Sequence, residues 1–205
     1  MKSFLRPASI AVSMMVSFAG LSVVPGCSSA PSRAQTPTNV PPRSGEADAK
    51  IRQADQASAK GNSDAAVMLY REAIVLDRDR YVAWNNLGVE LMKRGDYLDA
   101  VAALKVAADL SPRDPRPVAN IGLAYQEMGW ANDALVYYER ALMRDQTFLD
   151  ALRGYALAEE MLGRGSLESL EQIKRALMVE KDQKWRTFFE RRKFRVQALL
   201  RSSDL

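Results

Sequence analysis

The sequence predicts an all-α solenoid of stacked helix hairpins, and three observations carry this prediction. Four glycines, Gly61, Gly95, Gly129 and Gly163, lie 34 residues apart. Other small residues repeat at the same step, and apolar residues between them recur at helical spacing. A period of this length is typical of repeat proteins, in which each unit buries its apolar face against its neighbours. The small-residue columns are Ala54, Gly88, Gly122 and Ala156, then Ala66, Ala100 and Ala134, then Ala73, Ala107 and Ala141.

Each glycine is expected to follow the first helix of a hairpin, because only glycine adopts a left-handed cap at little steric cost. The second helix should start shortly afterwards. Ser63, Asp96 and Asn132 lie close to where its N-cap is expected.

The repeat resembles the tetratricopeptide repeat family. The unit 81–114 carries the family residues Trp84, Leu87, Gly88, Gly95, Ala100, Ala107 and Pro112. The unit 115–148 carries Ile121, Gly122, Tyr125, Gly129, Ala134, Tyr138 and Ala141. The resemblance implies a tetratricopeptide-type solenoid over 47–182, with weaker units at 47–80 and 149–182. In the last unit Ala176 lies 35 residues after Ala141, which predicts an inserted residue at 164–166.

Residues 183–205 are predicted to form a capping helix. Its apolar residues share one helical face and would cover the open flank of the last repeat; they are Trp185, Phe188, Phe189, Val196, Leu199 and Leu200. Residues 181–205 also hold eight Lys or Arg against three acids. An alternative is therefore that this basic helix lies on anionic lipid.

Residues 1–26 are predicted to be an export signal, because Lys2 and Arg6 precede an uncharged, largely apolar stretch that ends in small residues. Val24-Pro25-Gly26-Cys27 resembles the lipobox of bacterial lipoproteins, although Pro25 stands where that motif has Ala or Ser. The resemblance implies cleavage after Gly26 and lipidation of Cys27. Ser28 at the next position resembles an outer-membrane address, so we expect a lipid-anchored protein of the bacterial envelope that faces the periplasm. An uncleaved transmembrane anchor and a secreted protein with a chance cysteine are the alternatives.

Residues 27–46 follow as a lipidated tether. Four prolines among Ser, Thr, Gln and Asn leave too few apolar groups for a core, so this segment is expected to be disordered.

The composition argues against catalysis. The chain has 205 residues, no histidine and a single cysteine, and its net charge is +4. It therefore lacks the usual general base, a disulfide and a Cys-x-x-Cys pair, and its charge is small for a nucleic-acid binder. We expect no catalytic residue, cofactor, metal site, nucleic acid or small-molecule substrate.

The resemblance implies that the first helices line a concave groove that binds a protein segment. The groove residues predicted in this way are Val82, Asn85, Asn86, Val89, Arg116, Asn120, Leu123, Arg153 and Leu157. Val89, Leu123 and Leu157 share one column, which is either an apolar binding stripe or helix-packing core. The three asparagines offer donors and acceptors that suit a peptide backbone.

Two groove positions argue against a clamp for a terminal carboxylate. Asn86 and Arg116 match places that chaperone-binding relatives use for this purpose. Ile51 and Asp55, however, stand where that clamp has Lys and Asn.

The predicted function is a membrane-anchored scaffold or adaptor that binds a protein or peptide segment. In plan the chain is similar to lipoproteins that assist pilus assembly or other envelope complexes. The alternative is an accessory module that recognises cell-wall glycan or anionic lipid through the groove or the basic C-terminal helix.

Overall fold

The computed structural model describes residues 43–203, and within this range every regular element is an α-helix. The predicted signal, Cys27 and nearly all of the predicted tether lie outside the described residues. The helices are α1 (Ser44–Ala59), α2 (Ser63–Leu76), α3 (Tyr81–Lys93), α4 (Tyr97–Leu110), α5 (Pro115–Glu127), α6 (Ala131–Arg144), α7 (Leu149–Met161), α8 (Leu167–Val179) and α9 (Gln183–Ser203).

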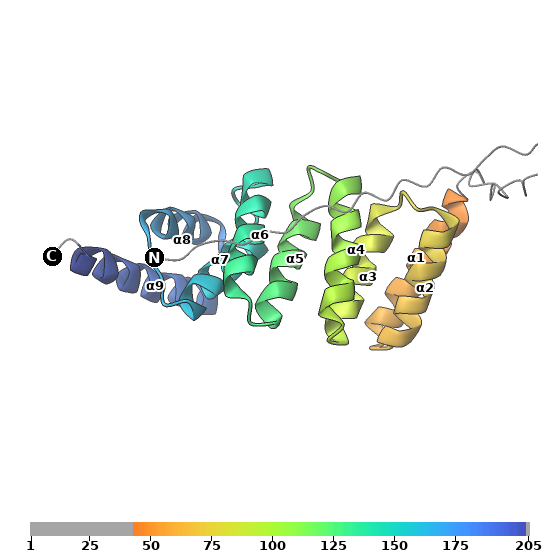
Figure 1. Cartoon of the computed structure of the whole chain (residues 1–205), viewed down its shortest axis with the longest axis horizontal. Coiled ribbons are helices and arrows are strands. Elements are labelled where there is room, and N and C mark those ends of the chain that lie inside the picture. The colour runs from red at the N-terminus through yellow and green to blue at the C-terminus, as the bar shows by residue number, and fades with distance from the viewer. Residues whose placement is uncertain (1–42, 204–205) are drawn as a thin grey trace, which may run out of the picture. The chain divides into compact units, whose positions relative to one another are not determined.

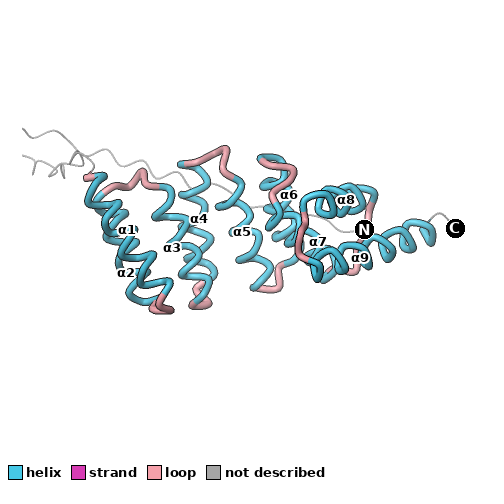
Figure 2. The backbone as a smooth tube through the Cα atoms, turned by 180° about the vertical axis from the view of Figure 1, so that it is seen from behind, coloured by secondary structure: helices cyan, strands magenta, loops and turns pink. Residues whose placement is uncertain are grey.

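The first eight helices form four hairpins that stack in chain order (Figure 1). Short loops join all of them (Figure 2). The prediction of an all-α hairpin solenoid with a C-terminal capping helix is confirmed. One boundary differs: α1 begins at Ser44, within the segment assigned to the tether. The Arg43 N–H donates to the Leu76 carbonyl and the Ser44 hydroxyl to Asp77, which holds this end of α1 on the end of α2.

The turn inside each hairpin is the one that the glycine period predicts. Gly61, Gly95, Gly129 and Gly163 have φ of 75°, 84°, 78° and 64°. The next N–H donates to a carbonyl five residues earlier, at 2.9–3.0 Å in all four turns, which closes the first helix.

The N-caps of the second helices lie slightly earlier than expected. Asn62 precedes Ser63 and accepts from the Ala65 N–H at 3.1 Å, and Trp130 occupies the position two residues before Asn132. Asp96 stands at the N-cap of α4 but makes no capping hydrogen bond with its side chain. Its carboxylate lies 3.1 Å from Arg94 instead.

The repeating small residues form the buried contacts between helices. Ala66, Ala100 and Ala134 have no exposed surface, nor do Ala73, Ala107 and Ala141. Large residues fill the space beside them, and Tyr70, Leu104 and Tyr138 are at most 2% exposed. Small and large columns thus alternate, which lets the backbones approach closely while the bulky side chains fill the space beside them.

Gly154 shows how tight this packing is. A Cβ added there would lie 2.2 Å from Cζ of Tyr138, a ring that is almost fully buried. The hydroxyl of Tyr138 donates to Gln126 of α5 at 3.1 Å. Tyr138 therefore joins α5, α6 and α7, and only glycine at 154 leaves room for its ring.

The fourth hairpin contains the predicted insertion. Ser169, Ile173 and Ala176 lie 35 residues after Ala134, Tyr138 and Ala141, and all three are at most 2% exposed. The loop between Gly163 and α8 absorbs the extra residue. Ser166 then starts α8 with a capping box, in which it exchanges hydrogen bonds with Ser169.

Helix α9 packs along α8 at the C-terminal end of the solenoid (Figures 1 and 2). Phe189 and Val196 have no exposed surface, and Phe189 lies against the rings of Trp185 and Phe188. Arg192 is also buried and donates to the carbonyl of Arg164. Burial lowers the pKa of Arg192, and its guanidinium lies 3.8 Å from Glu159. The apolar face of α9 therefore closes the last hairpin.

The capping role predicts different effects for two phenylalanines of α9. Phe189→Ala should lower the free energy of unfolding by about 3–5 kcal/mol, because it empties a fully buried site. Phe194→Ala is the matched control: Phe194 is 71% exposed, so its loss should be within about 0.5 kcal/mol. Urea denaturation followed by circular dichroism measures both. Equal losses would contradict the assignment of α9 as the cap.

Candidate functional site

The first helices of successive hairpins form the inner face of the solenoid. Helix α3 contacts α5 and α5 contacts α7, whereas the second helices contact mainly their own hairpin and the next first helix. Elements that approach more closely on one side make that side concave. The candidate site is therefore the surface of α1, α3, α5 and α7, which we call the inner face.

The apolar stripe Val89, Leu123 and Leu157 runs across three helices of the inner face. Leu123 is 38% exposed, and Val89 and Leu157 are half-buried. Their neighbours on the core side of the same helices, Leu87 and Ile121, are at most 5% exposed. The stripe is thus accessible, and Val82, which is 37% exposed, extends the apolar surface on α3.

The three asparagines form a hydrogen-bonded chain across the inner face. The amide of Asn120 donates to Asn85, that of Asn85 to Asn86, and that of Asn86 to Asp55, at 3.1, 3.1 and 3.2 Å. Tyr70 donates to the same Asp55 oxygen at 2.5 Å. Burial, together with this hydrogen bond, raises the pKa of Tyr70, so the hydroxyl stays protonated.

The hydrogen bonds between the asparagines decide which of their N–H groups can bind a ligand. Each amide uses one N–H to bind its neighbour, which fixes its orientation and leaves a second N–H. Asn85, Asn86 and Asn120 are therefore a pre-organised row and not three independent groups. Side-chain contacts between repeats of this kind cannot be read from one repeat alone.

Arg116 and Arg153, both predicted groove residues, have different surroundings. Arg116 is bound to Asp114, the N-cap of α5, and also donates to the hydroxyl of Tyr81 at 3.1 Å. The hydrogen bond to Asp114 raises the pKa of Arg116, whose side chain is 58% exposed.

Arg153 connects α7 to the C-terminal end of the solenoid. Its Nε and Nη2 each donate to the Glu180 carboxylate at 2.8 Å, and its guanidinium lies 4.8 Å from the ring centre of Trp185 in α9. The side chain of Glu180 is 1% exposed, and the hydrogen bonds from Arg153 hold its pKa below the ordinary value. Arg153 thus has a structural contact that the groove prediction did not foresee.

A cavity of about 260 Å³ opens between α1 and α3 on the inner face. It is lined by Asp55, Ser58, Ala59, Tyr70, Asn86, Val89, Glu90 and Lys93. Glu90 is only 2% exposed and accepts from Ser58 and Lys93 at 2.5 and 2.6 Å. Burial alone would raise the pKa of Glu90, but the hydrogen bonds from Lys93 and Ser58 outweigh it and lower the pKa.

Glu90 was missed in the sequence analysis, although a signal was present. It lies between Val89 and Leu91 on a helix whose buried face is otherwise apolar, and a carboxylate there needs partners. Those partners come from α1 and from the next turn of α3, so they are visible only in the folded chain.

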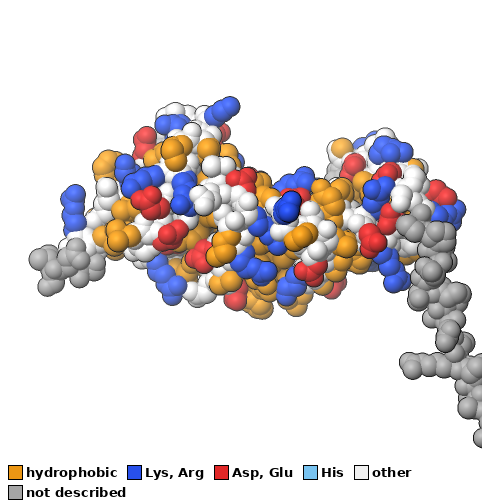
Figure 3. Space-filling model, turned by 90° about the horizontal axis from the view of Figure 1, so that it is seen from above, with side chains coloured by type: hydrophobic (Ala, Val, Ile, Leu, Met, Phe, Trp, Pro, Cys, Tyr) orange, Lys and Arg blue, Asp and Glu red, His pale blue; other side chains and the backbone are white. Residues whose placement is uncertain are grey.

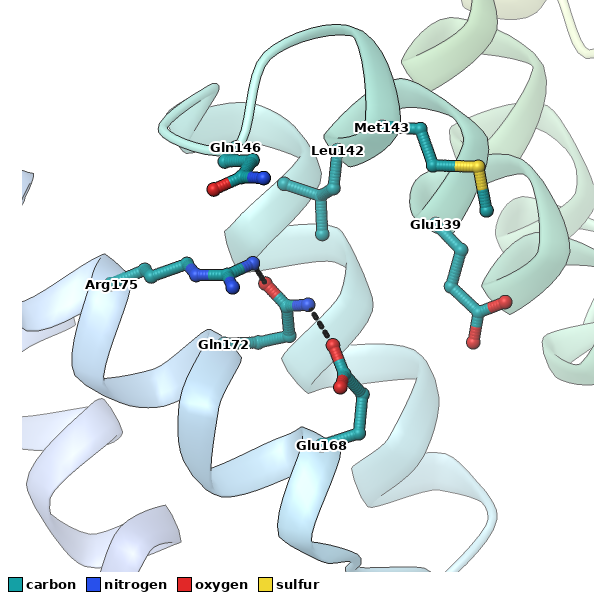
Figure 4. Close-up of a pocket in the computed structure, with 7 residues that line it drawn as sticks. All are labelled: Glu139, Leu142, Met143, Gln146, Glu168, Gln172 and Arg175. Carbon is teal, nitrogen blue, oxygen red and sulfur yellow. Dashed lines mark hydrogen bonds between the residues drawn. The ribbon is translucent and has the colours of Figure 1, made fainter.

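Two further cavities lie between second helices, away from the predicted groove. One of about 350 Å³ is lined by α6 and α8, where Gln172 donates to Glu168 and Arg175 to Gln172 (Figure 4). The other, of about 420 Å³, is mainly apolar and lies between α2 and α4, with Trp84 of α3 among its lining residues.

The surface mixes charges of both signs with scattered apolar groups, as one face shows in Figure 3. No helix within residues 43–203 is long and apolar enough to cross a membrane.

The tetratricopeptide repeat family model matches residues 116–148, which comprise α5 and α6 apart from the first residue of α5. The solved structures that share the fold include the following two. One of MamA has a TM-score of 0.58 at 24% identity and covers 64% of this chain and 77% of its own. The first tetratricopeptide domain of Spaghetti (RPAP3), bound to the HSP90 peptide SRMEEVD, has a TM-score of 0.57 at 17% identity and covers 60% and 98%. Residues 43–203 fold as a tetratricopeptide-type solenoid.

Sequence relatives with the same repeat are much longer proteins. Tetratricopeptide repeat protein 28 of Homo sapiens is 30% identical over 133 residues, and that of Mus musculus is 31% identical over 105. These matches span 64% and 51% of this chain but only 5% and 4% of the relatives. They support the repeat and carry no information on the activity of the whole protein.

The contacts of the two arginines predict unequal effects on stability. Arg153→Ala should lower the free energy of unfolding by about 3 kcal/mol, because it leaves the Glu180 carboxylate buried without its main partner. Arg116→Ala should cost less than about 1 kcal/mol, because that guanidinium is largely exposed. Urea denaturation at neutral pH measures the difference. An Arg153→Ala variant as stable as Arg116→Ala would contradict the structural role.

Proposed function

We propose that the chain is a membrane-anchored scaffold that holds a protein segment on its inner face. The observation that carries this proposal is the accessible apolar stripe of Val89, Leu123 and Leu157 beside the row of hydrogen-bonded asparagines. An apolar stripe contributes affinity through burial, and the second N–H of each oriented amide can bind a peptide carbonyl. Such a surface suits an extended or helical segment.

The shared fold supports a binding role over a catalytic one. The RPAP3 domain was solved with a peptide bound, so a solenoid of this size can hold a short segment. We propose the partner of this protein from the side chains of its own inner face, and not from the peptide in that complex.

The lipid anchor is proposed from the sequence around Cys27. Several acyl chains at roughly 0.8 kcal/mol per buried methylene hold a protein on a bilayer. The segment from Cys27 to the start of α1 would then keep the solenoid close to the membrane surface. We propose that the protein acts in this way at the bacterial outer membrane, on the periplasmic side, in the assembly of a pilus, secretion or other envelope complex.

A second candidate function is recognition of anionic lipid or glycan by α9. The observation that favours it is the solvent-facing side of this helix, where Lys184, Arg191 and Arg195 are exposed together with Phe194. Arg195 is already paired with Glu160 at 2.6 Å, which reduces the charge available. We therefore place this function second.

The stripe predicts that partner capture depends on its apolar side chains. Val89→Asp combined with Leu123→Asp should reduce capture from detergent-solubilised envelope by at least tenfold, because a charge replaces apolar contact at the centre of the surface. Helical circular dichroism should stay unchanged, because neither side chain is fully buried.

The matched control is Val75→Asp combined with Leu98→Asp, on α2 and α4, where the two side chains are 80% and 67% exposed. This pair should leave capture unchanged. Equal capture by the wild type, the stripe variant and the control variant would contradict the inner face as the binding surface. Loss of helicity in the stripe variant would show that the stripe is needed for helix packing.

The proposed anchor predicts the chemistry of the mature N-terminus. Mass spectrometry of the protein from its native membrane should find residues 1–26 removed and an acylated Cys27. Cys27→Ser should leave the protein unacylated and release it from the membrane fraction. A wild-type protein with an intact Met1 would contradict the lipoprotein proposal.

A further inference from the structure

The cavity between α1 and α3 has an excess of negative charge. Two of its lining groups, Asp55 and Glu90, are carboxylates, and Lys93 is its one cationic lining group. The lining therefore carries one net negative charge. A charge placed in a concave site is screened less by water than one on an open surface, so this excess favours a positively charged guest.

The carboxylate of Glu90 has an unused acceptor. Its Oε1 accepts from Ser58 and Lys93, but its buried Oε2 has no hydrogen-bond partner within the described residues. A buried carboxylate oxygen without a donor is energetically unfavourable. A donor that reaches this oxygen would satisfy it.

Lys93 lies on the solvent side of this carboxylate. Its side chain is 50% exposed, whereas that of Glu90 is 3% exposed. The lysine can therefore move outward and remain hydrated while an incoming cation approaches Glu90. Asp55 supplies a second, exposed carboxylate, whose one oxygen is held by Tyr70 and Asn86.

The cavity is continuous with the apolar stripe, because Val89 belongs to both. A segment that covers Val89 would bring its next side chains to the mouth of the cavity. A long basic side chain fits best, because its methylene stem can lie on Val89 and Ala59 while its charged head reaches the carboxylates.

We propose that this cavity binds a lysine or arginine side chain of the segment held on the inner face, with Glu90 and Asp55 as the accepting groups. The proposal rests on the binding function proposed above and specifies its chemistry: the partner segment carries a basic residue next to the apolar residues that cover the stripe. The carboxylate of Glu90 is then satisfied on both oxygens.

The test uses a single side chain as the probe, so it needs no knowledge of the partner. N-acetyl-lysine methylamide is titrated into the full chain in detergent micelles by isothermal calorimetry, with N-acetyl-norleucine methylamide as the uncharged probe of similar length. The lysine probe should bind with a dissociation constant of about 1–10 mM, and the norleucine probe at least tenfold more weakly. Equal binding of the two probes, or no binding of the lysine probe, would overturn the proposal.

Charge-removing variants locate the site. Glu90→Gln and Asp55→Asn keep the shape of each side chain and should each weaken the lysine probe about tenfold, as expected for the loss of a charged acceptor. Glu127→Gln is the matched control, because Glu127 is an exposed acid of α5 outside the cavity. An equal effect of all three would indicate general electrostatics and overturn the site.

Thermal unfolding of each variant shows whether it is folded. Should Glu90→Gln fail to fold, Asp55→Asn carries the test, because Asp55 is exposed. The outcome is separable from that of the proposed function. If the lysine probe does not bind but capture of the partner still depends on the stripe, only the cavity proposal is rejected. If the lysine probe binds but capture does not depend on the stripe, only the proposed binding function of the inner face is rejected.

Discussion

The close approach of helices at the small-residue columns is the constraint on which the rest of the structure depends. Ala66, Ala100 and Ala134 are fully buried where neighbouring helices meet, and the bulky column of Tyr70, Leu104 and Tyr138 fills the space that remains. No hairpin could bury these surfaces alone, so each becomes stable by stacking on the next. The inner face follows from this packing, because it sets which side of each first helix stays open.

The inner face combines three kinds of group. An apolar stripe provides burial, a row of amides provides oriented donors, and a cavity with excess negative charge provides a place for a cation. The stripe spans α3, α5 and α7, whereas the charge lies between α1 and α3. A bound segment that contacts the stripe, the amides and the cavity would therefore lie along the solenoid in one direction.

Much of the fold was predictable because it depends on local rules that repeat. Each left-handed turn needs a glycine, and four glycines therefore occur at intervals of 34 residues. The inserted residue before α8 was also visible, as a shift of the alanine column. The N-caps were less predictable, since Trp130 stands at the N-cap of α6 and its side chain makes no capping hydrogen bond.

The sequence by itself determined the period, the helix hairpins and the columns that become core, because each of these depends on residues within one repeat and its neighbour. Only the tertiary structure decided how the polar groups pair. Arg153 binds Glu180 and stacks on Trp185, Asn120 of α5 binds Asn85 of α3, and Glu90 of α3 accepts from Ser58 of α1. These pairs join residues whose distance is set by the curvature and register of the stack, and one repeat of sequence contains neither.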